Sequence, residues 1–176
     1  TDRLQFSIIK KRVEQLLAPS LQGRIAFHAA VYRIQDNPSR VWVTFDGEEI
    51  LGADDFRFER EVDRRYALRA AQLPERPNES FRELWQSDWL KQSHALSDEI
   101  ERQVKQDGYL ANYEMQQDLL QYPNLAFEQA LVHPHPFIRG IARLDRRLGK
   151  RRFLLLTHAS DFEQWCARTR QTVEQW

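Results

Sequence analysis

The sequence predicts an α+β fold, in which an N-terminal helix packs on a small antiparallel β-sheet and a helical C-terminal half follows. Apolar residues recur with the period of an amphipathic helix over residues 3–17, and this helix should end before Pro19. They alternate with a period of two over 25–32 and 40–45, as in half-buried strands. Nearly every segment after residue 77 has a helical pattern. A sheet this small is unstable alone, so it should pack against the helices.

Turn signals set the boundaries of the predicted sheet. Polar turn residues at 35–39 indicate a hairpin between the first two strands. Asp46 and Gly47 form a second tight-turn pair. After it, residues 49–51 together with 56–58 are expected to supply one more short strand.

A proline-bounded polar segment, Pro74 to Pro77, is the best candidate boundary in the chain. The preceding stretch, 59–73, fits either a short helix or the tail of the third strand, and periodicity does not decide between them. We expect a single domain over 1–176, with an alternative division into a helix and sheet at 1–73 and a helical part at 78–176.

Capping and breaking residues divide the second half into short helices. Asp107-Gly108 suits a helix end, and Ser160 with Glu163 forms a capping-box pattern that opens the last helix. Asn124 is expected to cap the helix that follows it. The expected helices begin at Ser80 and at about Ser97, cover 113–120, 125–132 and 137–152, and begin again at Ser160.

The most distinctive stretch is the basic segment at 137–153. One stripe of the expected helix is apolar and consists of Phe137, Ile141, Leu144 and Leu148. Cations repeat the same spacing on the opposite side, about 200° further round. The whole segment has seven Lys or Arg residues and the single Asp145, a local balance of +6 (7 − 1). We therefore expect a helix that is buried on one side and carries a row of cations on the other.

Elsewhere the charges balance, with 26 basic and 26 acidic residues in the chain. No overall field therefore draws the protein to nucleic acid or to a membrane. An acidic stretch at 46–63 has eight carboxylates and two arginines, a local balance of −6 (2 − 8). This stretch is a candidate partner for the basic helix within the same chain, which would leave no cations for an external ligand.

The composition favours a soluble cytoplasmic protein. A single cysteine, Cys166, rules out an internal disulfide and fits a reducing compartment. No apolar run approaches the roughly 20 residues that span a bilayer, so no membrane association is expected. Lys10, Lys11 and Arg12 interrupt the apolar N-terminal stretch, which argues against a signal peptide.

Three stretches resemble a family of small, uncharacterised bacterial proteins. They are residues 10–21 (KKRVEQLLAPSL), residues 40–50 (RVWVTFDGEEI) and residues 144–152 (LDRRLGKRR). They occur in this order along most of the chain, whereas residues 74–105 contribute little to the likeness. The family has no established activity, so the resemblance implies no catalytic residue.

A row of guanidinium groups can hold phosphates or carboxylates, which suggests a non-enzymatic binding or adaptor protein. The partner would be an acidic protein or a nucleic-acid backbone. Asp145 is expected to turn inward as a buried ion pair, with Arg146 as its internal partner. The predicted contact residues are Arg139, Arg143, Arg147 and Lys150, assisted by Lys10, Lys11 and Arg12.

Two other classes of function stay open. A metal-assisted hydrolase would use His133, His135 and nearby carboxylates, with His158 and Cys166 as further ligand types. The usual zinc spacings, a Walker loop and a Gly-x-Gly-x-x-Gly loop are absent from the sequence, so we expect neither a metal nor another cofactor. A homo-oligomer would join the acidic stretch of one copy to the basic helix of another.

The sequence also contains a candidate aromatic pair, Trp85 and Trp89. Trp85 and Trp89 are four residues apart and therefore neighbours on a helix. This spacing favours packing in the core or in an interface. If that helix is exposed, the pair is a partner site.

Overall fold

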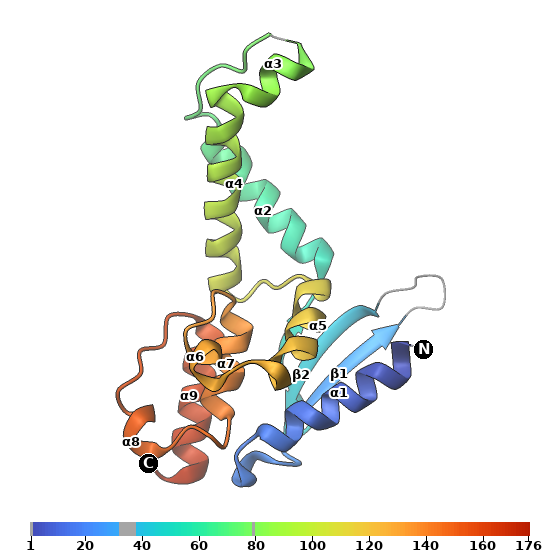
Figure 1. Cartoon of the computed structure of the whole chain (residues 1–176), viewed down its shortest axis with the longest axis vertical. Coiled ribbons are helices and arrows are strands. Elements are labelled where there is room, and N and C mark those ends of the chain that lie inside the picture. Colours follow the sequence, from blue (N-terminus) through green and yellow to red (C-terminus); the bar gives the residue numbers. More distant parts are fainter. Residues whose placement is uncertain (1, 32–37, 79) are drawn as a thin grey trace.

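The computed structural model describes residues 2–31, 38–78 and 80–176, and it confirms the α+β fold (Figure 1). An N-terminal helix, α1 (Asp2–Leu16), leads through the short 3₁₀ turn η1 (Pro19–Leu21) into the sheet. The three strands are β1 (Ile25–Val31), β2 (Pro38–Phe45) and β3 (Glu48–Ala53). Part of the predicted 35–39 turn lies outside the described residues.

The sheet is antiparallel, with strand order β1-β2-β3. Phe27 lies opposite Val43, and Val41 opposite Ala53, so these apolar side chains share the buried face. The β1 edge is covered by α1, because the Phe27 N–H donates to Glu14 Oε1 at 3.2 Å. This contact satisfies a backbone donor that an edge strand would otherwise expose.

The second half of the predicted third strand is helical instead. Asp54 accepts a hydrogen bond from the Arg57 N–H and caps α2 (Asp55–Ala70), so the prediction of a strand over 56–58 is wrong. A carboxylate at the N-cap satisfies a free N–H and favours the helix at this point. The helical interpretation of 59–73 is correct as far as Ala70.

A helical arm projects from the rest of the molecule (Figure 1). Its three helices are α2, α3 (Phe81–Gln86) and α4 (Asp88–Gln106). Helix α3 begins after Ser80 as predicted, and Ser80 forms a capping box with Glu83. The expected helix through Trp89 is interrupted at Ser87, whose extended backbone ends α3 and whose hydroxyl caps α4. No new helix begins near Ser97, because α4 runs through that position to the predicted end at Asp107-Gly108.

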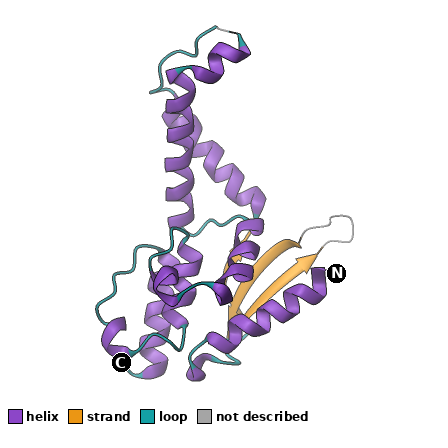
Figure 2. Cartoon of the chain, viewed as in Figure 1, coloured by secondary structure: helices purple, strands orange, loops and turns teal. Residues whose placement is uncertain are grey.

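The remaining helices form the body with α1 and the sheet (Figure 2). The helix expected at 113–120 is confirmed, and Ser160 and Glu163 open the last helix as predicted. The predicted Asn124 cap is wrong, because Ala126 is the N-cap of the next helix and Asn124 lies in a 3₁₀ turn. The helical elements of the body after the arm are α5 (Asn112–Gln121), η2 (Tyr122–Asn124), α6 (Phe127–Leu131), α7 (Pro136–Leu144), α8 (Lys150–Phe153) and α9 (Asp161–Glu174).

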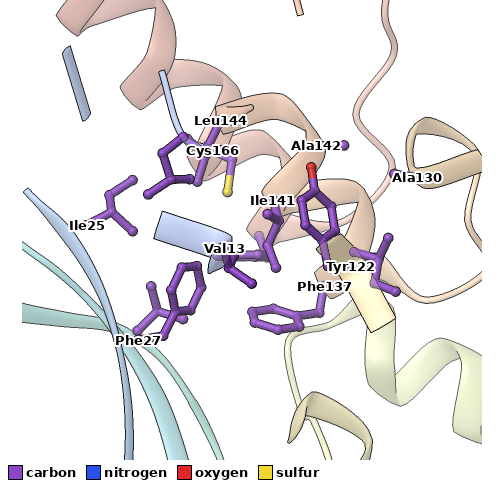
Figure 3. Packing of buried hydrophobic residues seen from close by; sticks show 14 of the residues in the cluster. Val13, Ile25, Phe27, Tyr122, Ala130, Phe137, Ile141, Ala142, Leu144 and Cys166 are labelled. Atoms are coloured by element: carbon purple, nitrogen blue, oxygen red, sulfur yellow. The ribbon is translucent and has the colours of Figure 1, made fainter. Parts of the chain in front are cut away.

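The core lies where the sheet, α1, α7 and α9 meet (Figure 3). Phe137 is central to this core. Its ring packs edge-on against Phe27, with 6.4 Å between the ring centroids, and stacks with Phe162, with 5.5 Å between the ring centroids. Cys166 is buried in the same cluster, and burial raises the pKa of its thiol well above the ordinary value. A buried neutral thiol is chemically inert, so Cys166 is a packing residue.

Candidate binding surface at the turn after α7

The segment expected to form one basic helix is folded as two helices with a turn between them. Helix α7 ends at Leu144, and Asp145 has an extended backbone with φ −71° and ψ 137°. A single helix over 137–152 is therefore a wrong prediction. The apolar stripe is nevertheless buried as expected; it consists of Phe137, Ile141, Leu144 and Leu148.

Asp145 ends α7 because its side chain anchors the turn from inside. The carboxylate is fully buried and accepts hydrogen bonds from the Tyr122 hydroxyl at 2.7 Å and from the Arg147 side chain at 2.7 and 3.0 Å. The Arg147 N–H adds a bond of 2.8 Å. The prediction of a buried acid is confirmed, but its partner is Arg147 and not Arg146. Burial and the adjacent carboxylate raise the pKa of Tyr122, so its hydroxyl stays protonated as a donor.

A second buried carboxylate, Glu163, holds α7 against α9. Arg139 Nη2 lies 2.9 Å from its Oε2, and Arg143 Nη2 lies 3.1 Å from its Oε1. Arg143 is only 3% exposed, so the prediction that it belongs to an exposed row of cations is wrong. Arg139 is also largely covered, with 14% of its side chain exposed. Burial would raise the pKa of Glu163, but its bonds to Arg139 and Ser160 outweigh burial and lower that pKa.

The cations that reach solvent lie further along, at 146–152, which we call the basic turn. Arg147 is paired with Asp145, and Arg152 with Glu128. Three others are exposed and have no ion-pair partner among the described residues; they are Arg146, Lys150 and Arg151. Guanidinium and ammonium groups in water are suited to phosphate or carboxylate ligands.

The end of α1 lies beside the basic turn. The Arg146 N–H donates to the Leu16 carbonyl at 2.8 Å, and Leu17 forms a bridge with Asp145. Arg12 is one turn before Leu16, about 6 Å along the helix axis, and is exposed like Lys11. Lys10 instead lies 3.7 Å from Glu14. The structure therefore places Arg12 within one helical turn of the residue that contacts the basic turn.

The acidic stretch at 46–63 does not neutralise the basic segment. Within the described residues its ion pairs involve Arg24, Arg40, Arg64 and Arg65. None joins it to 137–152, so the prediction of intramolecular pairing between the two segments is wrong.

The histidines considered as ligands of the alternative metal-assisted hydrolase lie in different surroundings. The His135 ring lies between two carboxylates of α5, with Nδ1 against Asp118 and Nε2 3.5 Å from Glu114 Oε2. These carboxylates contact opposite ring nitrogens, so they do not converge on one point. His158 Nδ1 accepts from Arg143 Nε at 3.3 Å. Over the described ranges, no three His, Cys, Asp or Glu side chains are placed to hold a metal ion.

Trp85 and Trp89 both lie on the arm but on different helices, α3 and α4, so the prediction that they are neighbours on one helix is wrong. Trp85 is 64% exposed, and Phe81 beside it is 80% exposed, with 5.9 Å between the ring centroids. Trp89 is half-buried beneath the guanidinium of Arg76. Sequence reasoning missed Phe81, although its four-residue spacing from Trp85 was available as a signal.

Sequence reasoning also missed Glu163 and Glu128 as partners of the basic segment. The capping-box spacing from Ser160 identifies Glu163 as a helix-start residue and gives no sign of a distant arginine. Both carboxylates lie many residues away in the sequence from the arginines they bind.

A protein-family model matches residues 5–171, which include all three stretches of the resemblance. The chain belongs to the SF0329 protein family. Comparison with curated proteins and with solved structures gives no match. Among the helices in the described part of the chain, none has the length and apolar character needed to cross a bilayer.

Proposed function

We propose that this protein is a non-enzymatic, cytoplasmic binding or adaptor protein of bacteria that recognises a polyanionic partner through the basic turn. The observation that carries the proposal is the exposure of Arg146, Lys150 and Arg151, which have no carboxylate partner in the part of the chain that the structure describes. Nearby cations are paired with Asp145, Glu128 and Glu163. The partner is an acidic protein or a nucleic-acid backbone, since both present closely spaced anions.

Buried contacts support this role because they hold the turn in one conformation. Arg170 donates to the carbonyls of Asp145 at 3.0 Å and Leu148 at 3.3 Å. Arg147 is held by Asp145, and its guanidinium lies 4.8 Å from the centroid of the Phe127 ring. A surface ordered before binding loses less conformational entropy when the partner arrives.

The proposal revises the residues assigned from the sequence. Arg146, Lys150 and Arg151 are the primary contacts, and Arg147 adds a fixed charge beside them. Lys11 and Arg12 extend the same surface. Arg139 and Arg143 hold α7 to α9, and Lys10 is paired with Glu14. These three residues are therefore not assigned as contacts.

The test is fluorescence anisotropy with labelled single-stranded RNA, single-stranded DNA and an oligoglutamate peptide, from low to physiological salt. The test variant carries Arg146→Glu, Lys150→Glu and Arg151→Glu. The control variant makes the same charge change on exposed residues of the arm, with Arg60→Glu, Arg82→Glu and Arg102→Glu.

We expect binding that weakens steeply with salt, since phosphate contacts release counterions. The turn variant should lose at least about tenfold in affinity, the effect of about 1.4 kcal/mol. The arm variant should stay close to the wild type. Equal losses of affinity in both variants would show that binding depends on net charge and not on the basic turn. The absence of binding to every probe at low salt would reject the proposal.

A further inference from the structure

A groove separate from the basic turn lies between the sheet and α9. It has a volume of about 550 Å³, and its sheet side is formed by Arg24 and Phe45. The helical side includes Trp165, Arg168, Thr169 and Thr172. Pockets for small molecules usually have volumes of about 300–1,000 Å³. The groove is therefore large enough for a ligand with one or two rings.

Its sheet side presents a fixed stack of an arginine on an aromatic ring. The Arg24 guanidinium lies 4.6 Å from the centroid of Phe45 and is held by Asp46 through two bonds of 2.9 and 2.6 Å. Asp46 is itself fixed, because it forms the β2–β3 turn with Gly47, with φ values of 51° and 87° that suit a type I′ hairpin. Arg24 keeps 42% of its side chain exposed, so a planar ligand can lie on its outer face.

The helical side supplies an aromatic edge and an available cation. Trp165 packs edge-on against Phe45 at 5.7 Å and is half-buried. Arg168, Thr169 and Thr172 follow at helical spacings of three, four and seven residues, so they lie on the same face of α9. Arg168 is exposed and has no ion-pair partner within the described part of the chain.

The charge of the groove favours an anion. Two guanidinium groups line it, and none of the described residues that line it carries a carboxylate. Asp46, which follows Phe45 in the chain, is bound to Arg24 through both of its carboxylate oxygens. The Thr169 hydroxyl adds a donor on the same side as Arg168, and the Thr172 hydroxyl already donates to the Arg168 carbonyl at 2.9 Å.

We infer that this groove binds a small aromatic anion, a planar ring that carries a phosphate or a carboxylate. The ring stacks on Arg24 and contacts Phe45 and Trp165, and the anionic group accepts hydrogen bonds from Arg168 and Thr169. A guanidinium matches both parts of such a ligand, because it stacks on rings and forks onto anionic oxygens. This inference does not depend on the proposed function of the basic turn, since it uses different residues.

The experiment is an NMR titration of the full chain that follows the indole N–H signal of Trp165, assigned with Trp165→Phe. Three ring-bearing anions are compared: adenosine monophosphate, 1-naphthyl phosphate and 2-naphthoate. Adenosine supplies a ring without the anion, and inorganic phosphate supplies an anion without the ring. The variant is Arg168→Glu, and Arg102→Glu on the arm is the matched control.

We expect the ring-bearing anions to shift the Trp165 signal saturably, and adenosine and phosphate to bind at least about tenfold more weakly. Arg168→Glu should weaken binding by about tenfold to a hundredfold, the usual effect of losing a hydrogen bond to a charged group. Arg102→Glu should leave it unchanged. A strong preference for adenosine monophosphate would identify nucleotides as the source, and similar affinities would indicate aromatic anions in general.

Two results would overturn the inference. One is the absence of a saturable shift with all three ring-bearing anions at about 10 mM, a concentration that detects even weak ligands. The other is equal affinity in Arg168→Glu and the wild type. Because Arg168 is exposed, its substitution should leave the fold intact, and the remaining indole signals check this directly.

Discussion

The arm and the body of this molecule are both largely helical, but they are stabilised in different ways. Helix α7 in the body has nine residues and buries eight of them, whereas α2 in the arm has sixteen residues and buries none. The arm relies on contacts such as the hydrogen bond between Tyr66 and Ser93 and the ion pair between Arg69 and Glu99.

The same type of ion pair therefore contributes differently to stability in each region. In the body, Arg143 and Glu163 are 3% and 1% exposed, so each neutralises a charge that water cannot reach. In the arm, Arg69 and Glu99 are 36% and 42% exposed, and water solvates either residue when its partner is lost. Burial, rather than the distance between the charges, decides how much each pair matters.

The largest expected effect comes from removing the buried carboxylate. Glu163→Ala leaves Arg143 without its anionic partner in the body and should lower the free energy of unfolding by about 3–5 kcal/mol. Glu99→Ala in the arm should change it little, because Arg69 stays solvated. Urea denaturation of both variants measures the contrast. A small loss for Glu163→Ala would show that the body tolerates an unpaired arginine.

The next largest effect tests packing. A Cβ at Gly140 would lie 2.3 Å from ring atoms of Phe162, which is itself stacked on Phe137. Gly140→Ala should therefore destabilise the protein by about 1–3 kcal/mol through overpacking. Ala67→Leu adds more atoms to the exposed surface of α2 and should stay within about 0.5 kcal/mol of the wild type. Similar thermal unfolding midpoints for the two variants would contradict this contrast.

A smaller effect concerns the junction between arm and body. Lys105 of α4 bonds to Glu114 at 2.7 Å, and Glu114 and Asp118 of α5 contact His135 before α7. Burial alone would lower the pKa of His135, but its contacts with Asp118 and Glu114 outweigh burial and raise that pKa.

Because the pKa of His135 is raised in the folded state, its protonated ring stabilises the fold fully below the ordinary histidine pKa of about 6.5. This stabilisation is lost as the pH rises through the higher pKa of the folded state. His135→Gln should remove this loss from the dependence of the free energy of unfolding on pH, measured by urea denaturation at a series of pH values. Burial lowers the pKa of His28, His133 and His158, so these residues change the free energy of unfolding with pH in the direction opposite to His135. The difference between the variant and the wild type isolates the contribution of His135. Identical profiles for the variant and the wild type would exclude a charged His135 at the junction.

The smallest effect on stability is expected at the tip of the arm. Phe81 and Trp85 are exposed, so Phe81→Ser with Trp85→Ser should change the free energy of unfolding by less than about 0.5 kcal/mol. Guanidinium denaturation checks this. A clear loss of stability would show that the aromatic pair holds the arm together, and would remove the main contrast with the body.

Local signals predicted much of the fold correctly. The period-two patterns identified the first two strands, and the pairing of Ser160 with Glu163 identified the start of α9. Such elements are encoded by residues a few positions apart. The same kind of evidence correctly placed Phe137 and Leu148 on the buried side, although a turn separates them.

The errors arose where a distant contact competes with a local pattern. The spacing of the arginines favours one long helix, but Asp145 is held by Tyr122 and Arg170, which extend the backbone at that point. The row of cations appeared exposed because Glu163 is twenty residues from Arg143 in the sequence. No helical periodicity reveals a carboxylate supplied by another helix.

The length of α4 has a consequence for how partners could assemble on this molecule. Its nineteen residues span about 28 Å at the rise of an α-helix. The helix therefore acts as a spacer that holds the aromatic pair of α3 well away from the body surface (Figure 1). A partner bound at the tip and a polyanion bound at the basic turn would occupy separate volumes, so one copy of the protein could bridge the two without steric conflict.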